Sequence, residues 1–545
     1  MNSTKELWSI LKVKAGSMQQ TSLKELFENN PQRAQRLAFD FDSYHLDVSK
    51  QFIDDELVKL LFKFAENRGL RKKIQTLING GVVNITENRP ALHTALRLPK
   101  ESSLYLNGKN VVDDVQHSIN KMEGIVKKVH GGYWRGYSGK AITDIVNIGV
   151  GGSDLGPFMV VNALKEFRAK TRNKLDFHFV SSMDGTQVFK LLDNLNPETT
   201  LFVISSKSFT TVDTFYNANT AMEWMLAKCE DKELILKQHF IGVSADEKKM
   251  TTWGIVEDNQ LKFWEWVGGR FSLWCAIGLP VALSIGMHNF KNLLAGAHAM
   301  DEHFSNSDMS CNLPIILGLV GVWNATFLEI NAHTVLPYDG RLQFFPNYLT
   351  QLEMESNGKA VDNNGVKVSY PTCPILWGDI GPNAQHAFYQ LLHQGTQRVS
   401  CDFIAPIKRY HDNETENGAD EYLLKQHKLA LANCLAQSRV LAFGNNAISD
   451  TGDMPAHKFY KGNQPSTTLL INELNPYTLG GLVALYEHKV YVMAALWDIN
   501  PFDQWGVEIG KVIANEILQK LDVSESSGKT DSSTEQLLSI ITNKA

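Results

Sequence analysis

The sequence lacks the features that mark membrane or exported proteins. Its most apolar runs, near Trp274–Met287 and Leu313–Trp323, are shorter than the ~20 residues that cross a bilayer. No basic N-terminal segment is followed by an apolar segment, so we expect no secretory signal peptide. None of its six cysteines forms a CxxC pair, which favours reduced thiols over a disulfide framework or a zinc site. We therefore expect a cytoplasmic protein.

An excess of positive charge is missing as well. The 545 residues carry a formal net charge of −6, which argues against non-specific binding to nucleic acid. An anionic substrate would therefore need cations placed locally. A hydrophobic content of 43% and a charged content of 21% are typical of a globular protein. The length is enough for about two or three domains with large cores.

The motifs of nucleotide and metal sites are incomplete or absent. Residues 145–157 (IVNIGVGGSDLGP) predict a strand that enters a glycine-rich turn, but Asp154 stands at the third glycine of GxGxxG. No GxxxxGK[ST] and no HExxH occurs in the sequence. What remains is a turn in which Gly152 and Ser153 could donate to sugar hydroxyls or to phosphate, which is a weak signal alone.

The strongest signal that is present is Leu201–Thr211, LFVISSKSFTT. Its first four residues predict a buried strand, and the pattern after it predicts a helix. A strand that ends in a hydroxyl-rich turn before a helix offers N–H groups, hydroxyls and a positive helix end to a phosphate monoester. An ordinary N-cap explains one or two hydroxyls, so five with an ammonium favour the anion site. The residues are Ser205, Ser206, Lys207, Ser208, Thr210 and Thr211.

Strands and helices alternate from Asp144 onward, which predicts parallel sheets with helices on both faces. Residues 1–110 are instead rich in helical patterns, such as 57–67 and 69–79. The chain thus reads as two α/β units in tandem with helical additions. A hairpin is predicted at 360–369, an acidic loop at 412–421, and a Ser-rich linker at 524–533 before a short helix. The predicted strands are 145–148, 177–181, 201–205, 239–243, 374–377, 402–406 and 468–473.

Two segments place charged residues beside glycine. In Trp266–Leu273 (WVGGRFSL), Arg270 follows two glycines, either as a structural ion-pair partner or as a fixed cation beside a reacting group; spacing alone favours the structural role. Residues 351–359 (QLEMESNGK) hold Glu353 and Glu355, which would point apart on a helix and share a face on an extended segment. Composition does not choose between the two carboxylates.

Two further patterns predict helices. His386 and His393 are seven residues apart and therefore lie on one face of a predicted helix, at a spacing that suits metal poorly.

Residues 501–521 predict a helix with Asp503 as its N-cap, on which Gln504, Glu508 and Lys511 share a face. That face is either solvated, with a Glu508–Lys511 pair, or partly buried beside Trp505 and Gly506.

Together these segments resemble the phosphoglucose isomerase family, in order from about Arg89 to Lys511. The resemblance implies two tandem sugar-isomerase-type αβα sandwich domains with mainly parallel sheets, at residues 111–285 and 286–510. It implies a helical N-terminal extension at 1–110 that packs on the second domain, and a C-terminal helix and tail at 511–545. The segments are RPALHTALR, NIGVGGSDLGP, SSKSFTT, VGGRFSLWCAIG, MESNGK, GPNAQHAFYQLLHQGT, NELNPYTLGGLVALYEH and FDQWGVEIGK.

The resemblance also implies a reaction and the residues that carry it. The reaction is the interconversion of glucose 6-phosphate and fructose 6-phosphate, in glycolysis and gluconeogenesis, through ring opening and a cis-enediol intermediate. Glu355 matches the base that moves a proton between C2 and C1, and Arg270 matches the cation beside the intermediate. His386 and Lys511 match the groups that open and close the ring. The matched sugar or phosphate contacts are Gly152, Ser153, Ser206, Lys207, Ser208, Thr211, Gln351 and Gln504.

The family is expected to need no metal or organic cofactor and to act as a homodimer, in which each site takes its histidine from the partner subunit. Two positions depart from its pattern. Ser208 stands where threonine is more usual, which keeps the hydroxyl. Asp213 stands where the family usually has a glutamate that supports the histidine, so its reach to His386 is one methylene shorter.

Two alternatives stay open. A non-catalytic sugar-phosphate-binding regulator would keep SSKSFTT but would not need Glu355, His386 and Lys511 together, and would usually carry a basic DNA-binding module. An isomerase that also accepts mannose 6-phosphate would have the same motifs.

Overall fold

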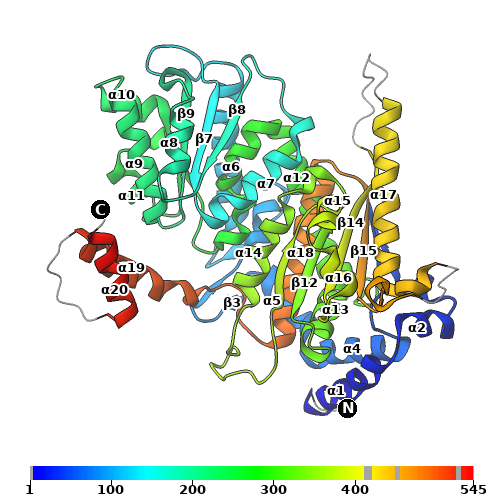
Figure 1. Ribbon diagram of the computed structural model, residues 1–545. Coiled ribbons are helices and arrows are strands. Elements are labelled where there is room, and N and C mark those ends of the chain that lie inside the picture. Colours follow the sequence, from blue (N-terminus) through cyan, green and yellow to red (C-terminus); the bar gives the residue numbers. More distant parts are fainter. Residues whose placement is uncertain (1–3, 410–419, 449–453, 523–529, 544–545) are drawn as a thin grey trace. The chain divides into compact units, whose positions relative to one another are not determined.

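The computed structural model describes residues 4–409, 420–448, 454–522 and 530–543. The chain divides into two compact units, residues 1–501 and 502–545. The first unit contains two mostly parallel sheets flanked by helices (Figure 1). The predicted acidic loop at 412–421 lies outside the described residues except for its last two, which begin α17 (Asp420–Phe443).

The first sheet is entirely parallel, with strand order β11-β10-β9-β7-β8. Every residue of its central strand β9 is buried. Val146 and Phe202 of the sheet pack with Ala218 and Met222 of α9 (Val212–Leu226) in one apolar core. The strands are β7 (Asp144–Gly149), β8 (Asp176–Val180), β9 (Thr200–Ser205), β10 (Phe240–Ser244) and β11 (Gln260–Lys262). The neighbouring helices are α6 (Val111–His130), α7 (Leu155–Ala163), α8 (Thr186–Leu192), α10 (Lys232–His239) and α11 (Glu247–Trp253).

The second sheet has the order β1-β2-β15-β14-β12-β13. Its β15, β14, β12 and β13 are parallel, whereas β1 and β2 join as an antiparallel hairpin on β15. The strands are β1 (Ala38–Phe41), β2 (Tyr44–Asp47), β12 (Ala332–Pro337), β13 (Ile375–Gly378), β14 (Ser400–Lys408) and β15 (Ser466–Glu473).

The seven predicted strands are all present, but β1, β2, β11 and β12 were not predicted. The first three are short. The second and third residues of β12 are the polar His333 and Thr334, and no local sequence pattern indicates that they are buried. His333 is satisfied inside the sheet by Ser400 and Asp402 on the next strand, at 2.8 and 3.1 Å.

The N-terminal segment contains several helices, in line with its helical patterns, and its hairpin extends the second sheet through β2 and β15. Buried Arg33 holds the chain between β2 and α4, since its guanidinium donates to the carbonyl oxygens of Ser49, Gln51 and Ile53. The predicted boundaries near 110, 285 and 510 stay predictions. The helices are α1 (Thr4–Gln20), α2 (Leu23–Asn29), α3 (Arg33–Arg36), α4 (Asp55–Asn67) and α5 (Leu70–Ile78).

Two long helices cross at glycines. In α18 (Pro476–Trp497) nearly every residue is buried, and it packs on α12 (Leu279–Asn306) and α13 (Leu313–Val322). A Cβ on Gly480 would lie 2.0 Å from the carbonyl oxygen of Leu293, and one on Gly296 would lie 1.8 Å from that of Tyr477. The two backbones therefore touch where only glycine fits.

One predicted helix and one predicted hairpin differ in the structure. The predicted helix that carries His386 and His393 is broken at Phe388 (φ −137°) into α15 (Gly381–Ala387) and α16 (Tyr389–Gln394), so the two histidines do not share one helix face. The hairpin predicted at 360–369 forms a single antiparallel bridge, between Val361 and Lys367, with Gly365 at φ +77° in its turn.

In the second unit the predicted helix begins later than expected. A short 3-10 turn at Trp505–Val507 precedes α19 (Glu508–Asp522), so Asp503 is not its N-cap and Gln504 lies outside it. The prediction that Gln504 shares a helix face with Glu508 and Lys511 is therefore wrong. The short terminal helix predicted after the linker is present as α20 (Ser532–Thr542). Across the described ranges, no helix has the length and apolar character needed to cross a membrane.

Gly480→Ala should destabilise the protein by about 1–3 kcal/mol, because the new methyl group overpacks the crossing of α12 and α18. Gly124→Ala is the matched control, since Gly124 is also inside a helix but a Cβ there meets no atom within 4 Å. That control should gain up to about 1 kcal/mol through reduced chain entropy. Thermal unfolding of the two variants measures the difference, and a melting temperature for Gly480→Ala equal to that of the control would contradict the close crossing.

Candidate functional site

The site is built where the adjacent strands β7 and β9 end. Gly149 of β7 pairs in register with Ser205 of β9, so the glycine turn and the hydroxyl-rich turn leave the same edge of the sheet. Parallel strands bring their carboxyl ends to one edge, which is where ligands usually bind in α/β sheets. The two motifs that the sequence singled out separately are thereby neighbours.

The glycine turn packs directly against the segment that carries Arg270. A Cβ on Gly152 would lie 2.0 Å from the carbonyl oxygen of Gly269, and Gly151 has a φ of +58°. The hydroxyl of Ser272 donates to the carbonyl oxygen of Gly152 at 3.3 Å. Glycine at 151 and 152 therefore allows the 3-10 turn Gly151–Ser153 to touch the 3-10 helix Gly269–Trp274.

Arg270 is buried and holds three segments together. Its Nε donates to Ser356 Oγ at 2.6 Å, and its Nη2 donates to the carbonyl oxygen of Pro501 at 2.5 Å. Its Nη1 lies 3.5 Å from Glu355 Oε1. A guanidinium is always charged, so this is a fixed positive charge beside a carboxylate.

Glu353 and Glu355 point to opposite sides of α14 (Phe345–Asn357), as expected for residues two apart on a helix. Glu355 is partly exposed and faces Arg270, whereas Glu353 is buried and pairs with Lys489 of α18 at 2.9 Å. The amide of Gln351, one turn before Glu355, donates to its Oε2 at 2.9 Å. Gln351 also borders the glycine turn, since a Cβ on Gly151 would lie 2.9 Å from its Nε2.

The hydroxyl-rich turn connects β9 to α9. Ser206 Oγ and Thr211 Oγ1 lie 3.0 Å apart, and Thr210 donates to the exposed Ser208 at 2.8 Å. Thr211 occupies the N-cap position but makes no side-chain cap bond, which is not the arrangement of an ordinary N-cap.

Lys207 ties this turn to the Arg270 segment. Its ammonium donates to the carbonyl oxygens of Glu265 and Val267 at 2.7 and 3.0 Å. Burial, helped by the nearby Arg89 guanidinium, lowers the pKa of Lys207, while the Glu265 carboxylate opposes the shift. The ammonium thus binds carbonyl groups that lie five and three residues before Arg270 in the chain.

His386 is exposed on α15 and borders a surface pocket that also contains His393 and Tyr389. Asp213 lies in the first turn of α9, at intermediate exposure. Within the described ranges of one chain, no hydrogen bond or ion pair joins His386 to Glu355 or to Asp213. The single chain therefore brings together residues 151–153, Arg270, Gln351 and Glu355, but does not connect His386 with them.

In the second unit Lys511 Nζ pairs with Glu508 Oε1 at 2.8 Å on the exposed surface of α19. This is the Glu508–Lys511 pair that the solvated alternative predicted.

Several residues of the site were not found from the sequence. Ser356 and the Pro501 carbonyl hold Arg270, and Lys359 donates to the last carbonyls of α14, those of Glu355 and Ser356. A lysine near a helix C-terminus often donates to the last carbonyls of that helix, so the role of Lys359 could have been predicted from its position in the sequence. Among the described residues, no group of three or more His, Cys, Asp or Glu side chains could hold a metal ion.

Asp154 is an unusual carboxyl between the glycine turn and α7. It is 7% exposed, and its Oδ1 has no hydrogen-bond partner in the described part of the chain. Burial raises the pKa of Asp154 to about 7. The residue that breaks GxGxxG is thus a buried acid directly beside the residues expected to touch the ligand.

Comparison with known proteins gives a consistent result over nearly the whole chain. A family model described as phosphoglucose isomerase matches residues 47–538. A glucose-6-phosphate isomerase from Psychrobacter cryohalolentis is 56% identical over 536 residues, covering 97% of this chain and 95% of that relative. Glucose-6-phosphate isomerase 2 from Chromohalobacter salexigens is 53% identical over 543 residues, covering 98% of this chain and 97% of that relative.

A solved structure agrees with these sequence matches. The crystal structure of a glucose-6-phosphate isomerase from Chlamydia trachomatis superimposes with a TM-score of 0.84 at 28% identity, over 99% of both chains. The predicted α/β fold class with mainly parallel sheets is thereby confirmed.

Asp154→Asn should change how stability depends on pH. Unfolded aspartate has a pKa of about 3.9, so the folded chain holds a proton that the unfolded chain releases. The parent should therefore lose stability as pH rises from about 4 to about 7, and then level off. The neutral amide removes this loss, so the melting temperature of the variant should rise relative to the parent over that interval. An equal relative gain in Asp193→Asn, which changes an exposed aspartate, would exclude burial as the cause.

Proposed function

The chain belongs to the phosphoglucose isomerase family, and we propose that it interconverts D-glucose 6-phosphate and D-fructose 6-phosphate at the cluster of Arg270, Gln351 and Glu355. The observation that carries this placement is the 3.5 Å approach of the Arg270 guanidinium to the Glu355 carboxylate. A positioned carboxylate can act as a general base, and a fixed guanidinium can hold developing negative charge.

In the proposed proton transfer, Glu355 removes the proton from C2 of the open-chain aldehyde. The carbonyl oxygen at C1 then gains negative charge, which Arg270 stabilises in a cis-enediol intermediate. The protonated Glu355 returns the proton to C1 on the same face of the sugar, while the hydroxyl proton on O2 passes to O1 and C2 becomes the carbonyl carbon, which yields the ketose. Gln351 supports this step because its bond to Oε2 limits rotation of the carboxylate.

The proposed phosphate site is the turn after β9. The N-terminal N–H groups of α9, with Ser206, Ser208 and Thr211, suit a dianion, and the Lys207 ammonium adds positive charge to the same turn. Gly152 and Ser153 lie at the same sheet edge and are proposed as further contacts to sugar or phosphate. Anchoring the phosphate keeps C1 and C2 within reach of Glu355.

Ring opening and closing are assigned to His386 and Lys511, with Gln504 as a substrate contact and Asp213 as support for the histidine. We propose that His386 acts in the site of a second copy of this chain, in a homodimer with shared active sites. Its exposure, and the lack of a bond to Glu355 within the described part of one chain, support this arrangement.

The proposed setting is glycolysis and gluconeogenesis in the cytoplasm. Each proposed step uses only side chains of this chain, so we expect full activity in the presence of a chelator. A regulator without catalysis is not favoured, because it would not need a base beside a fixed cation. Activity on mannose 6-phosphate is tested separately, with that sugar phosphate as the substrate.

Glu355→Gln keeps the size of the side chain but removes the proton acceptor. Isomerisation should fall by at least about a hundredfold, the low end for a general base, with little change in substrate affinity. A coupled assay of fructose 6-phosphate conversion, with exchange of C2 tritium into solvent, measures the step itself. Glu302→Gln, at an exposed glutamate of α12, is the control. Tritium exchange at the parent rate in Glu355→Gln would show that another group is the base.

Mixing two inactive variants tests the shared site. If each chain lends His386 to its partner, a dimer of Glu355→Gln with His386→Ala has one site with both lesions and one with none. Random mixing makes about half of the dimers mixed, so roughly a quarter of all sites should recover. Activity is measured after the two variants are refolded together, and each refolded alone is the control. Proven mixed dimers without recovered activity would assign His386 to its own chain.

A further inference from the structure

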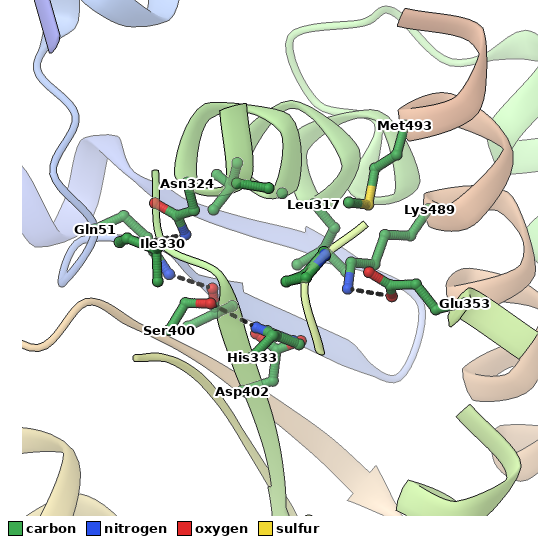
Figure 2. Close-up of a pocket in the computed structure, with 15 residues that line it drawn as sticks. Gln51, Leu317, Asn324, Ile330, His333, Glu353, Ser400, Asp402, Lys489 and Met493 are labelled. Atoms are coloured by element: carbon green, nitrogen blue, oxygen red, sulfur yellow. Dashed lines mark hydrogen bonds and ion pairs between the residues drawn. The ribbon is translucent and has the colours of Figure 1, made fainter. Parts of the chain in front are cut away.

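The last turn of α14 is bound on the side opposite to Glu355. Glu353 and Lys489 have side-chain exposures of 2% and 3%, and their charged atoms are 2.9 Å apart. Figure 2 shows the two side chains pointing toward one another from α14 and α18. The second oxygen of Glu353, Oε1, has no hydrogen-bond partner among the described residues, so the carboxylate depends on Lys489.

A second bond joins the same two helices one turn further on. Asn357 is four residues after Glu353, and its amide donates to the carbonyl oxygen of Val490, the residue after Lys489, at 3.2 Å. Residues four apart lie on one face of a helix. The end of α14 is therefore attached to α18 at two points along one line.

The helix that carries Lys489, α18, is itself fixed within the fold. A capping box at Asn475 opens α18, and nearly all of its residues are buried. Burial lowers the pKa of Lys489, but the carboxylates of Glu353 and Asp402 outweigh it, so the net shift is upward and the ammonium stays charged. Asp402 is itself held by Tyr486 of α18 at 3.0 Å and by His333 of β12 at 3.1 Å.

We propose that Glu353 and Lys489 are positioning residues for the isomerisation: their buried ion pair, together with the Asn357–Val490 bond, sets the rotation of α14 and so the direction of Glu355. The inference rests on the proposed function, in which Glu355 is the base. A carboxylate lies ~6 Å from the helix axis, so rotating α14 by about 10° moves it by about 1 Å. Misplacement by that distance can cost about a hundredfold in rate.

The test compares Lys489→Met with the double variant Glu353→Met/Lys489→Met. The single variant leaves a buried carboxylate unpaired and should be less stable. The double variant replaces the pair by apolar side chains, which often leaves stability unchanged, but it still loses the directional bond. Both should lower kcat by about ten- to a hundredfold, with KM within about twofold of the parent.

The decisive readout is the kinetic isotope effect with substrate deuterated at C2. A misplaced base slows proton removal, so the isotope effect on kcat should increase in both variants. A merely structural role would lower the folded fraction, and hence kcat, without changing that effect. Tyr491→Phe is the matched control, because it removes a hydrogen bond of the same helix, to the carbonyl oxygen of Lys73 at 2.8 Å, that is not part of the network around Lys489. It should keep the parent kcat and isotope effect.

A stable double variant with the parent kcat, or variants with lowered kcat and the parent isotope effect, would overturn the proposal. If Lys489→Met does not fold, the double variant and Glu353→Gln, which keeps the side-chain shape, carry the test. Glu355→Gln is measured in parallel. Normal C2 exchange in that variant would refute the proposed base. If Glu355→Gln is inactive but the variants at residues 353 and 489 keep the parent kcat and isotope effect, only the positioning role is refuted.

Discussion

The buried guanidinium of Arg270 is the interaction on which the candidate site depends. It binds Ser356 of α14 and the carbonyl of Pro501, and it lies 3.5 Å from Glu355. A charge that is removed from water must be paired and hydrogen-bonded, so these segments are held at fixed distances from one another. The partner carboxylate is itself partly exposed, which leaves it open toward a ligand.

Close backbone approach makes this arrangement possible. Gly152 touches Gly269, and Gly480 touches Leu293 where α12 crosses α18. In the first case a larger residue would push the turn away from Arg270, and in the second it would shift the helix that carries Lys489. The glycines that looked like a failed dinucleotide motif are explained by packing between segments more than 100 residues apart in the sequence.

Buried polar groups link the second sheet to the same helix. His333 bonds Ser400 and Asp402 within the sheet (Figure 2). Tyr486 joins Asp402 to α18, and Lys489 lies one turn further along that helix. Each of these groups is costly to bury alone and is stabilised by its partners. The network therefore connects the interior of the second sheet with the helix that supports the end of α14.

Much could be predicted from the sequence, because local chemistry carries it. The apolar strands of both sheets follow from hydrophobic runs between turn signals. The hydroxyl-rich turn before α9 follows from composition, and Glu355, Arg270 and the fold class follow from motifs that resemble one family. The comparisons confirm the family and the fold.

The rest was decided by contacts between distant residues, which leave no local pattern. Whether Glu353 or Glu355 faces Arg270 depends on α14 being helical up to Asn357, and the spacing of the histidines gives no sign of the break at Phe388. The polar strand β12 was missed for the same reason, because His333 is paired with Ser400 and Asp402 of the neighbouring strand. A sequence specifies which groups are available within a few residues, whereas pairing buried charges requires partners that only the folded chain brings within a few ångströms.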